Sequence, residues 1–247
     1  MPVLAVTLEL CHWSFFNSDR VSLPQLTHLT LAECRFKPFA DAPSLQVDGI
    51  AVPLTSLFKS FGLHPARLQH LNVNGCGASR PNNALLGGGK LARFSLLTSL
   101  SLAGSDFVSN AVAAAAAQLP ALQHLDLRTG RCCRWRSGGG ARRLGDAAAV
   151  ALGGGRIRSS LRSLVMDADP DLSDAGVAAL AQLTALTRLN LGAPLIGGGV
   201  GDAGARAIGR GLPRLRSLRI NAAYLSESGC SALGALTQLT GALQPYL

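Results

Sequence analysis

Leucines recur along the chain in a pattern that alternates with polar residues. The repeating unit is Leu-x-x-Leu-x-Leu-x-x-Cys-x-φ, where φ is apolar, and one copy consists of Leu26, Leu29, Leu31, Cys34 and Phe36. Two leucines separated by one polar residue have the period of a strand with one buried face. Most successive copies begin 23 to 29 residues apart, so the pattern predicts stacked coils of a single unit. The copies begin at Val3, Leu26, Leu68, Leu97, Leu122, Leu161, Leu186 and Leu215, and a degenerate fragment follows near Leu239.

A second pattern follows the strand motif in the later copies. It consists of an apolar residue, Ser-Asp-x-Gly and a short run rich in alanine and leucine, and it is clearest from Leu172 to Leu180. Serine before such a run is an N-cap signal, because its side chain accepts a hydrogen bond from a free backbone N–H. We therefore expect short outer helices in segments 108–116, 144–152, 172–180, 200–208 and 225–233.

Together the two patterns resemble the cysteine-containing leucine-rich repeat of F-box leucine-rich-repeat proteins, which is similar to the ribonuclease-inhibitor-like repeats. The resemblance runs from Val3 to about Leu239. It implies an α/β solenoid, or horseshoe, with a parallel sheet on the concave face and short helices on the convex face. It also implies that a partner binds on the concave face. F-box proteins carry a helical segment before their repeats, whereas the first repeat here begins at Val3.

The pattern predicts one domain over residues 1–247, with about eight repeats and a partial one. The long interval after Leu26 leaves room for a hidden degenerate repeat near Leu45. Segment 128–143 is rich in arginine and glycine, and we interpret it as an inserted loop because the helix motif resumes directly afterwards. The glycine runs at 87–89, 153–155 and 197–199 are interpreted as smaller flexible insertions. Neither end carries a capping signal, so we expect a longer protein or ends that a partner covers.

Strand alternation predicts which side chains point out of the concave face: those two, four and six positions after the first leucine of each copy. Arginine is favoured in binding hot spots, so Arg128, Arg188 and Arg219 are the leading candidates. Asp126 and Asp167 are expected to pair with them. The alternative for any one position is a solvated sheet face. The full candidate set for partner binding is His28, His70, Asn72, His124, Asp126, Arg128, Asp167, Arg188, Asn190 and Arg219.

The inserted loop carries a second candidate site. Its basic residues with one tryptophan are suited to gripping phosphates and stacking on a base, or to contacting an acidic protein groove. A disordered insertion typical of a GC-rich genome is the alternative, and Cys132–Cys133 inside it is a candidate redox pair. The loop residues concerned are Arg131, Arg134, Trp135, Arg136, Arg142 and Arg143.

Two further motifs suggest chemistry but fit the repeat better. His28 and His70 fall in one column, yet no third ligand lies beside them, and zinc sites usually have three or four protein ligands. The segment Gly199-x-Gly201-x-x-Gly204 matches a dinucleotide fingerprint, but Gly204 occupies the place of the repeat glycine Gly176. We therefore expect no metal, no cofactor and no small-molecule substrate, and no catalytic residues.

The composition of the chain limits the cellular locations that the sequence predicts. The net charge of +9 is carried mostly by arginine, and apolar residues make up 48% of the chain, mainly leucine, alanine and valine. No apolar run is long enough to cross a membrane, and the N-terminus lacks a secretory pattern. Six cysteines in that context predict reduced thiols and a cytoplasmic location, with the cytoskeleton or cilium axoneme as the alternative.

The expected function is a protein–protein interaction scaffold. A narrower form is the substrate-recognition part of an SCF-type ubiquitin ligase. The alternatives are an axoneme-associated repeat protein and nucleic-acid binding through the arginine-rich loop.

Overall fold

The computed structural model describes eleven stretches of the 247-residue chain. They are residues 4–9, 25–32, 35–36, 65–75, 77–78, 91–105, 108–128, 144–166, 171–192, 200–221 and 224–240.

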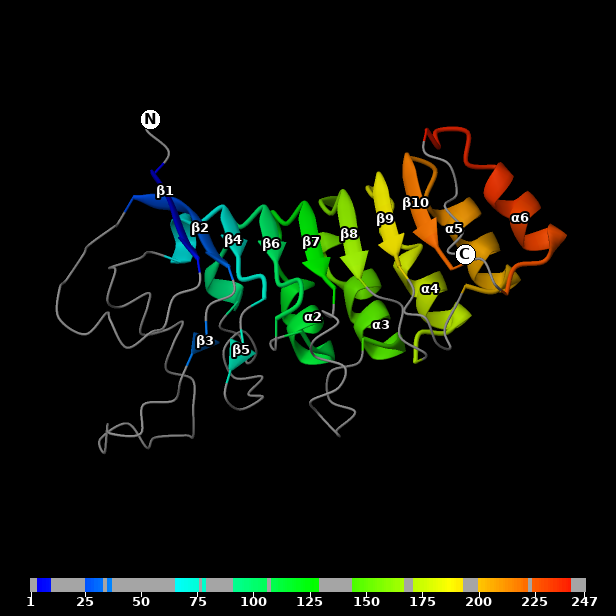
Figure 1. Ribbon diagram of the computed structural model, residues 1–247. Helices are drawn as coiled ribbons and strands as arrows, with labels where there is room; N and C mark the ends of the chain where they lie inside the picture. The colour runs from blue at the N-terminus through cyan, green and yellow to red at the C-terminus, as the bar shows by residue number, and fades with distance from the viewer. Residues whose placement is uncertain are drawn as a thin grey trace.

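A single parallel sheet runs through these coils, and its strands follow one another in chain order (Figure 1). Each strand belongs to one of the eight copies of the leucine pattern, since neighbouring leucines and valines pair in register. A second sheet of two short strands, β3 (Arg35–Phe36) and β5 (Gly77–Ala78), lies beside it. The main strands are β1 (Leu4–Glu9), β2 (Leu26–Ala32), β4 (His70–Asn72), β6 (Ser99–Ser101), β7 (His124–Leu127), β8 (Ser163–Met166), β9 (Arg188–Leu191) and β10 (Ser217–Ile220).

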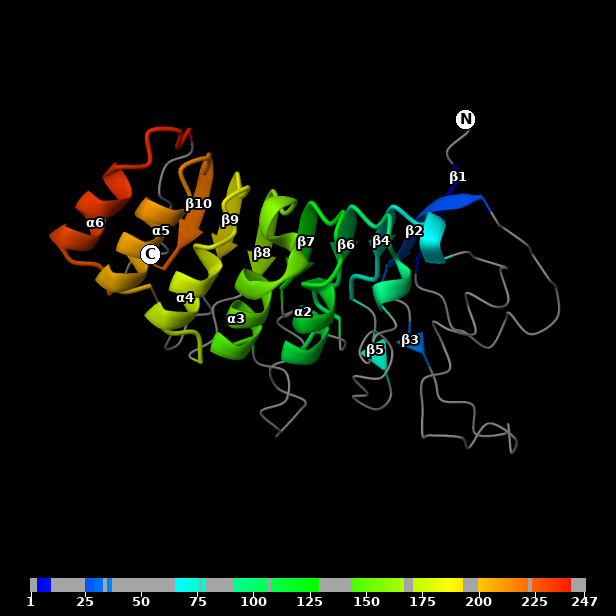
Figure 2. The same ribbon diagram turned by 180° about the vertical axis from the view of Figure 1, so that it is seen from behind.

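Short helices pack side by side along the other side of the sheet (Figure 2). They occur in the five segments where the Ser-Asp-x-Gly pattern or its weaker forms predict them. Ser109, Ser173 and Ser226 are N-caps whose side chains accept backbone N–H hydrogen bonds. The helices are α2 (Asn110–Ala116), α3 (Asp146–Gly154), α4 (Asp174–Leu180), α5 (Asp202–Gly211) and α6 (Glu227–Gly234), and the 3₁₀ turns are Pro65–Arg67, Leu91–Arg93 and Arg156–Ser159.

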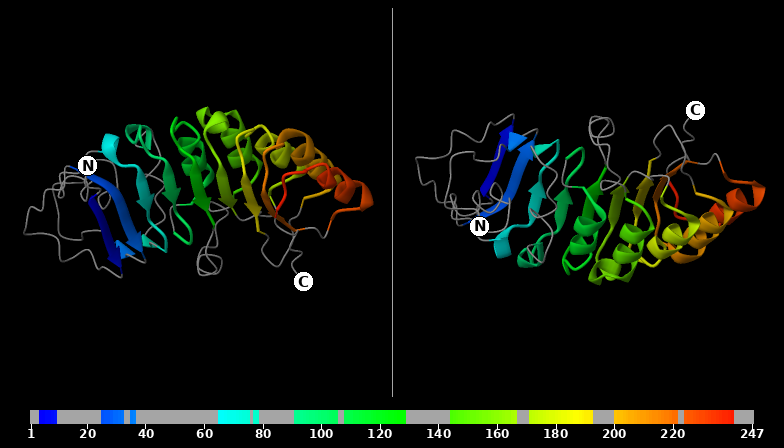
Figure 3. Two further views of the ribbon diagram at one scale, coloured as in Figure 1. Left: turned by 90° about the horizontal axis from the view of Figure 1, so that it is seen from above. Right: turned by 90° about the horizontal axis from the view of Figure 1, so that it is seen from below.

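The coils follow a shallow arc, with the strands along its inner side and the helices along its outer side (Figure 3). The fold is therefore an α/β leucine-rich-repeat solenoid, with a parallel sheet on the concave face and short helices on the convex face. This confirms the predicted fold class.

The core is a stack of leucines, one set from each coil. The first leucine of the copies at 68, 97, 122, 161, 186 and 215 is buried, and strand residues alternate between buried and partly exposed. Burying one leucine side chain stabilises a fold by about 1.5–3 kcal/mol. Because each coil covers the leucines of its neighbour, the stability of one coil depends on the coils packed beside it.

Aspartates at the helix starts link the last four coils to one another, and we call Asp146, Asp174 and Asp202 the linking aspartates. Asp146 Oδ1 accepts the backbone N–H of Ser173 at 2.8 Å, and its Oδ2 accepts the Ser173 hydroxyl at 2.6 Å. Asp174 Oδ1 accepts the backbone N–H of Gly201 at 2.8 Å. Asp202 makes the same pair of bonds to Ser226. At Ser173 and Asp174 the serine thus caps a helix while the aspartate joins two coils.

One expectation about the insertions is wrong. The glycines at 153–155 are not a flexible insertion. Gly153 and Gly154 end α3, and a β-carbon on Gly153 would lie 2.1 Å from the carbonyl oxygen of Ala179. In the main sheet β2 pairs directly with β4. The possible degenerate repeat near Leu45 lies outside the described residues and stays a prediction. The glycine runs at 87–89 and 197–199 lie outside the described residues.

The cysteine position of the motif is an inward position where the structure describes it. Ser105 occupies it after β6 and is 3% exposed, and its hydroxyl has no hydrogen-bond partner in the described residues. Just before it, Gly104 has a φ of 69°, as Gly75 has a φ of 65° in an earlier coil. Both glycines turn the chain away from the strand in the left-handed region that other residues rarely adopt.

Candidate binding face

The register of the parallel strands brings the predicted outward residues into two columns. The first column joins His28, His70, Ser99, His124, Ser163, Arg188 and Ser217 as direct neighbours from strand to strand. The second joins Thr30, Asn72, Ser101, Asp126, Val165, Asn190 and Arg219. These are the columns that strand alternation predicts. Their side chains are partly or fully exposed, whereas the leucines between them are buried.

Histidines stack at one end of the first column. The His28 and His70 rings have centroids 4.0 Å apart and an interplanar angle of 15°. Burial lowers the pKa of His70 below its ordinary value of 6.5, and the charges of His28 and His124 lower this pKa further. Thr27 Oγ1 lies 2.8 Å from His28 Nδ1, within hydrogen-bonding distance. The ring of His70 is therefore held in its neutral form at a pH where an isolated imidazole begins to charge.

The stacked geometry does not resemble a metal site. Parallel rings present their faces to each other, whereas two metal-binding imidazoles direct their ring nitrogens at one point. In the described part of the chain, no group of three or more histidine, cysteine or acidic side chains is close enough to hold a metal ion. The same part holds no helix long and apolar enough to cross a membrane.

The expected pairing of acidic and basic residues occurs at β7. Arg128 binds the Asp126 carboxylate through two nitrogens, with Nη2 to Oδ2 at 2.7 Å and Nε to Oδ1 at 3.0 Å. The Arg128 side chain is 53% exposed and that of Asp126 is 20% exposed. This pair presents a fixed carboxylate and guanidinium side by side on the sheet face.

The remaining candidates differ in how accessible they are. Arg188 is exposed in the first column. Asn72 uses its Oδ1 to accept the backbone N–H of Asn74 at 3.0 Å, and Asn190 Oδ1 is buried and has no hydrogen bond in the described residues. The two asparagines therefore offer a partner fewer accessible hydrogen-bonding atoms than their sequence positions suggest. Arg219 is partly exposed at β10.

One outward position in the third column serves the fold. Asn74 Oδ1 accepts the Ser101 hydroxyl at 2.7 Å and the backbone N–H of Ala103 at 2.8 Å. The Asn74 side chain therefore bridges to the next coil instead of pointing to a ligand.

Several candidates lie outside the described residues. They are Asp167 and the loop residues Arg131, Arg134, Trp135, Arg136, Arg142 and Arg143. Their predicted roles stay predictions. The interpretation of Gly204 as the repeat glycine is supported, because it lies in α5 where a β-carbon would be 2.6 Å from Asp174 Oδ1.

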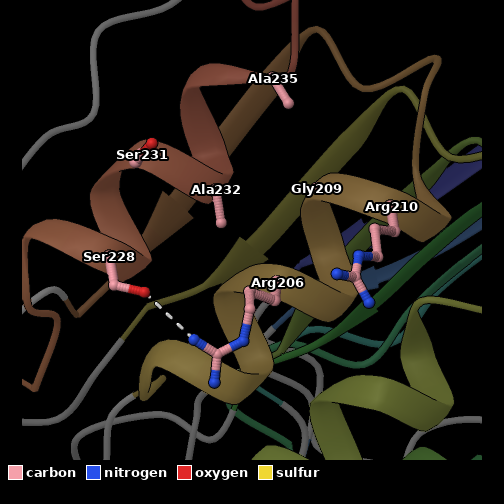
Figure 4. Close-up of a pocket in the computed structure, with 7 residues that line it drawn as sticks. All are labelled: Arg206, Gly209, Arg210, Ser228, Ser231, Ala232 and Ala235. Atoms are coloured by element: carbon pink, nitrogen blue, oxygen red, sulfur yellow. Dashed lines mark hydrogen bonds between the residues drawn. The ribbon is translucent and has the colours of Figure 1, made fainter.

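A hollow on the convex side was not foreseen from the sequence. It has a volume of about 290 Å³ and lies between α5 and α6 (Figure 4). Arg206 points across it and donates to the Ser228 hydroxyl at 3.2 Å, while Arg210 lies one turn further along α5. The sequence signal was present as two arginines four residues apart. The two arginines line a hollow only because α6 packs beside α5.

Comparison with known proteins gives a fold likeness alone. No family model matches the chain, and no curated protein matches it. One similar solved structure is the crystal structure of an internalin from Listeria monocytogenes, with 17% sequence identity and a TM-score of 0.47. The match covers 89% of this chain and 55% of the internalin chain, so the protein spans about half the length of that structure.

Proposed function

We propose that the protein is an interaction scaffold that binds a protein partner through the outward face of its sheet. The observation that carries the proposal is the pair of columns, in which polar and charged side chains follow one another from β2 to β10 in register, interrupted only by Val165. Core packing explains the buried leucines between them but does not require histidine, aspartate or arginine on the outside. The proposal assigns the protein no reaction, cofactor or small-molecule substrate.

The face has the length that a macromolecular partner needs. Neighbouring strands lie about 4.8 Å apart, so eight strands extend over roughly 34 Å. A helix or an extended segment of a partner fits along this distance. The stacked histidines, the Asp126–Arg128 pair and Arg188 divide the face into chemically different parts. Such differences along the face would set the orientation of a bound partner.

A narrower form of the proposal is substrate recognition for an SCF-type ubiquitin ligase. It is supported by the resemblance of the repeat, with cysteine at positions 34 and 76, to the cysteine-containing class. Co-purification of ligase subunits with the protein from its own cells would test this form. An axoneme-associated role and nucleic-acid binding through the arginine-rich loop are the alternatives, and no described contact favours either of them.

The test compares two substitutions in neighbouring coils. His124→Glu places a negative charge on the exposed sheet face, and Gln118→Glu makes the same change in charge at an exposed position in the turn after α2. Affinity capture from the native lysate, quantified by mass spectrometry, should show partners that His124→Glu loses and Gln118→Glu keeps. Equal capture by both variants and the parent would refute binding through the sheet face.

A further inference from the structure

Arginines gather at one edge of the last three coils. Because the strands are parallel, all strand starts lie at the same edge, and the helix starts lie at the opposite edge. Arg162, Arg188 and Arg216 lie at or next to the starts of β8, β9 and β10, and Arg214 lies in the turn before β10. All four are exposed. We call these four residues the arginine patch.

The backbone holds the patch in a fixed arrangement. Arg162 O accepts the N–H of Thr187 at 2.8 Å, and Thr187 O accepts the N–H of Arg216 at 2.7 Å. The Thr187 hydroxyl also donates to Arg162 O, at 3.0 Å. Arg162 and Arg216 are thus two coils apart in one row, a separation of roughly 10 Å. Only the arginine side chains need to be ordered when a ligand binds.

The positive charge of the patch is not neutralised locally. The linking aspartates lie at the opposite edge, where hydrogen bonds to the next coil engage them. Within the stretches that the structure describes, none of the four patch arginines forms an ion pair with a carboxylate. Like charges gathered at one edge attract an anionic partner and speed its association.

A hollow opens within the patch. It has a volume of about 330 Å³, and it is lined by Thr187, Pro213, Arg214, Arg216 and Gln238. Two arginines at its wall can bind a carboxylate through paired N–H groups, the geometry in which guanidinium groups bind carboxylates best. The convex hollow is less suited to an anion, because the Asp202 carboxylate lies close enough to Arg206 for their charges to interact.

We propose that the arginine patch binds an extended acidic segment of the protein partner, at the edge that adjoins the outward sheet face. This inference rests on the proposed scaffold function and names the chemistry of the partner. About three residues of extended chain span the 10 Å between Arg162 and Arg216. Arg188 belongs to both the patch and the first column, so one partner can reach from the sheet face onto the edge.

A protein segment fits the patch better than a nucleic acid does. Double-stranded DNA binding commonly uses six to ten phosphate contacts, whereas the row that holds Arg162 and Arg216 is neutral in the preceding coils, at Gln69, Thr98 and Gln123. Single-stranded nucleic acids are held largely by stacking on aromatic side chains. The four patch residues and the lining of the hollow include no aromatic side chain.

Peptide binding by the full chain tests the proposal. The probe is a fluorescein-labelled twelve-residue peptide with glutamate at alternate positions, measured by anisotropy beside the same peptide with glutamine and a random 20-base-pair DNA duplex. The patch variant is Arg162→Gln with Arg216→Gln. The matched control is Arg93→Gln with Arg210→Gln, which removes the same charge from exposed positions outside the patch. Circular dichroism confirms that each variant is folded.

We expect the glutamate peptide to bind at low salt, the patch variant to weaken binding at least tenfold and the control variant less than twofold. The glutamine peptide should not bind. Equal weakening by both variants would overturn the proposal, because the overall positive charge would then explain binding. Patch-dependent binding of the duplex that is tighter than binding of the glutamate peptide would also overturn it. Absence of peptide binding would also overturn it. If His124→Glu still loses partners in that case, the scaffold function stands and only the acidic segment is wrong.

Discussion

Gly176 lies in the first turn of α4, directly against a linking aspartate. A β-carbon at this position would lie 2.2 Å from Asp146 Oδ1 and 2.8 Å from Leu172 Cδ1. Real β-carbons essentially never approach other atoms below 3.0 Å, so Gly176→Ala must displace the Asp146 carboxylate. That carboxylate also holds the N–H and hydroxyl of Ser173, and both bonds would weaken.

The net effect is a balance of three terms. Overpacking costs about 1–3 kcal/mol. Weakening two solvent-exposed hydrogen bonds to a carboxylate adds about 1 kcal/mol, below the usual range for charged groups because water replaces them. Alanine in place of glycine favours the helix by up to about 1 kcal/mol. We therefore expect Gly176→Ala to lower the free energy of unfolding by about 2 kcal/mol.

Gly154 provides the matched control, because a β-carbon there would have no atom within 4 Å. Gly154→Ala should raise the free energy of unfolding by up to about 1 kcal/mol through helix propensity alone. Urea denaturation followed by circular dichroism measures both variants. A double-mutant cycle with Asp146→Ala separates the carboxylate from the leucine contact, and Gly176→Ala should cost less in that background.

Two results would refute this reasoning. If Gly176→Ala stabilised the protein as much as Gly154→Ala, the carboxylate would not be packed against the glycine. If the cost of Gly176→Ala were the same with and without Asp146, the clash would lie elsewhere, and the linking role of the aspartate would lose its support.

The remaining predictions concern single groups. Ser105→Cys should raise the free energy of unfolding by about 1 kcal/mol in urea denaturation, because the apolar thiol of the repeat replaces a buried hydroxyl that has no hydrogen-bond partner in the described residues. An unchanged midpoint of urea denaturation would contradict this prediction. Hydrogen bonds from the Ser226 hydroxyl and N–H hold the pKa of Asp202 below its ordinary value of 3.8, so its stabilising effect should be complete above pH 3.8 and should be lost as the pH falls through the lowered pKa. Asp202→Asn should flatten this part of the stability–pH curve, and an unaltered curve would count against it. NMR titration should give His70 a pKa below 6.5, and this pKa should rise in His28→Ala. The contribution of His70 to the free energy of unfolding should fall as the pH drops from 6.5 toward the lowered pKa. A His70 pKa at its ordinary value would disprove the stacked arrangement.

The leucine pattern by itself determined the strands and their outward columns. Side chains alternate across a strand with a period of two, and each coil repeats the same leucine positions, so stacking the coils leaves only one register that buries every leucine. The sequence alone therefore predicts that His28, His70 and His124 lie in one column, as they do. The helices were equally predictable, because serine caps and alanine-rich runs act within a few residues.

Tertiary structure alone decided what joins one coil to the next and what lies beside each site. Asp146 binds Ser173 across 27 residues of sequence, and this contact explains why the motif needs its glycine. The tight packing of Gly153 against Ala179 and the direct pairing of β2 with β4 likewise depend on neighbouring coils. The arginine patch has the same origin, since its members are 54 residues apart at the extremes and meet only because parallel strands begin at one edge. A local pattern determines each coil, whereas contacts between coils depend on the length and path of the chain that connects them.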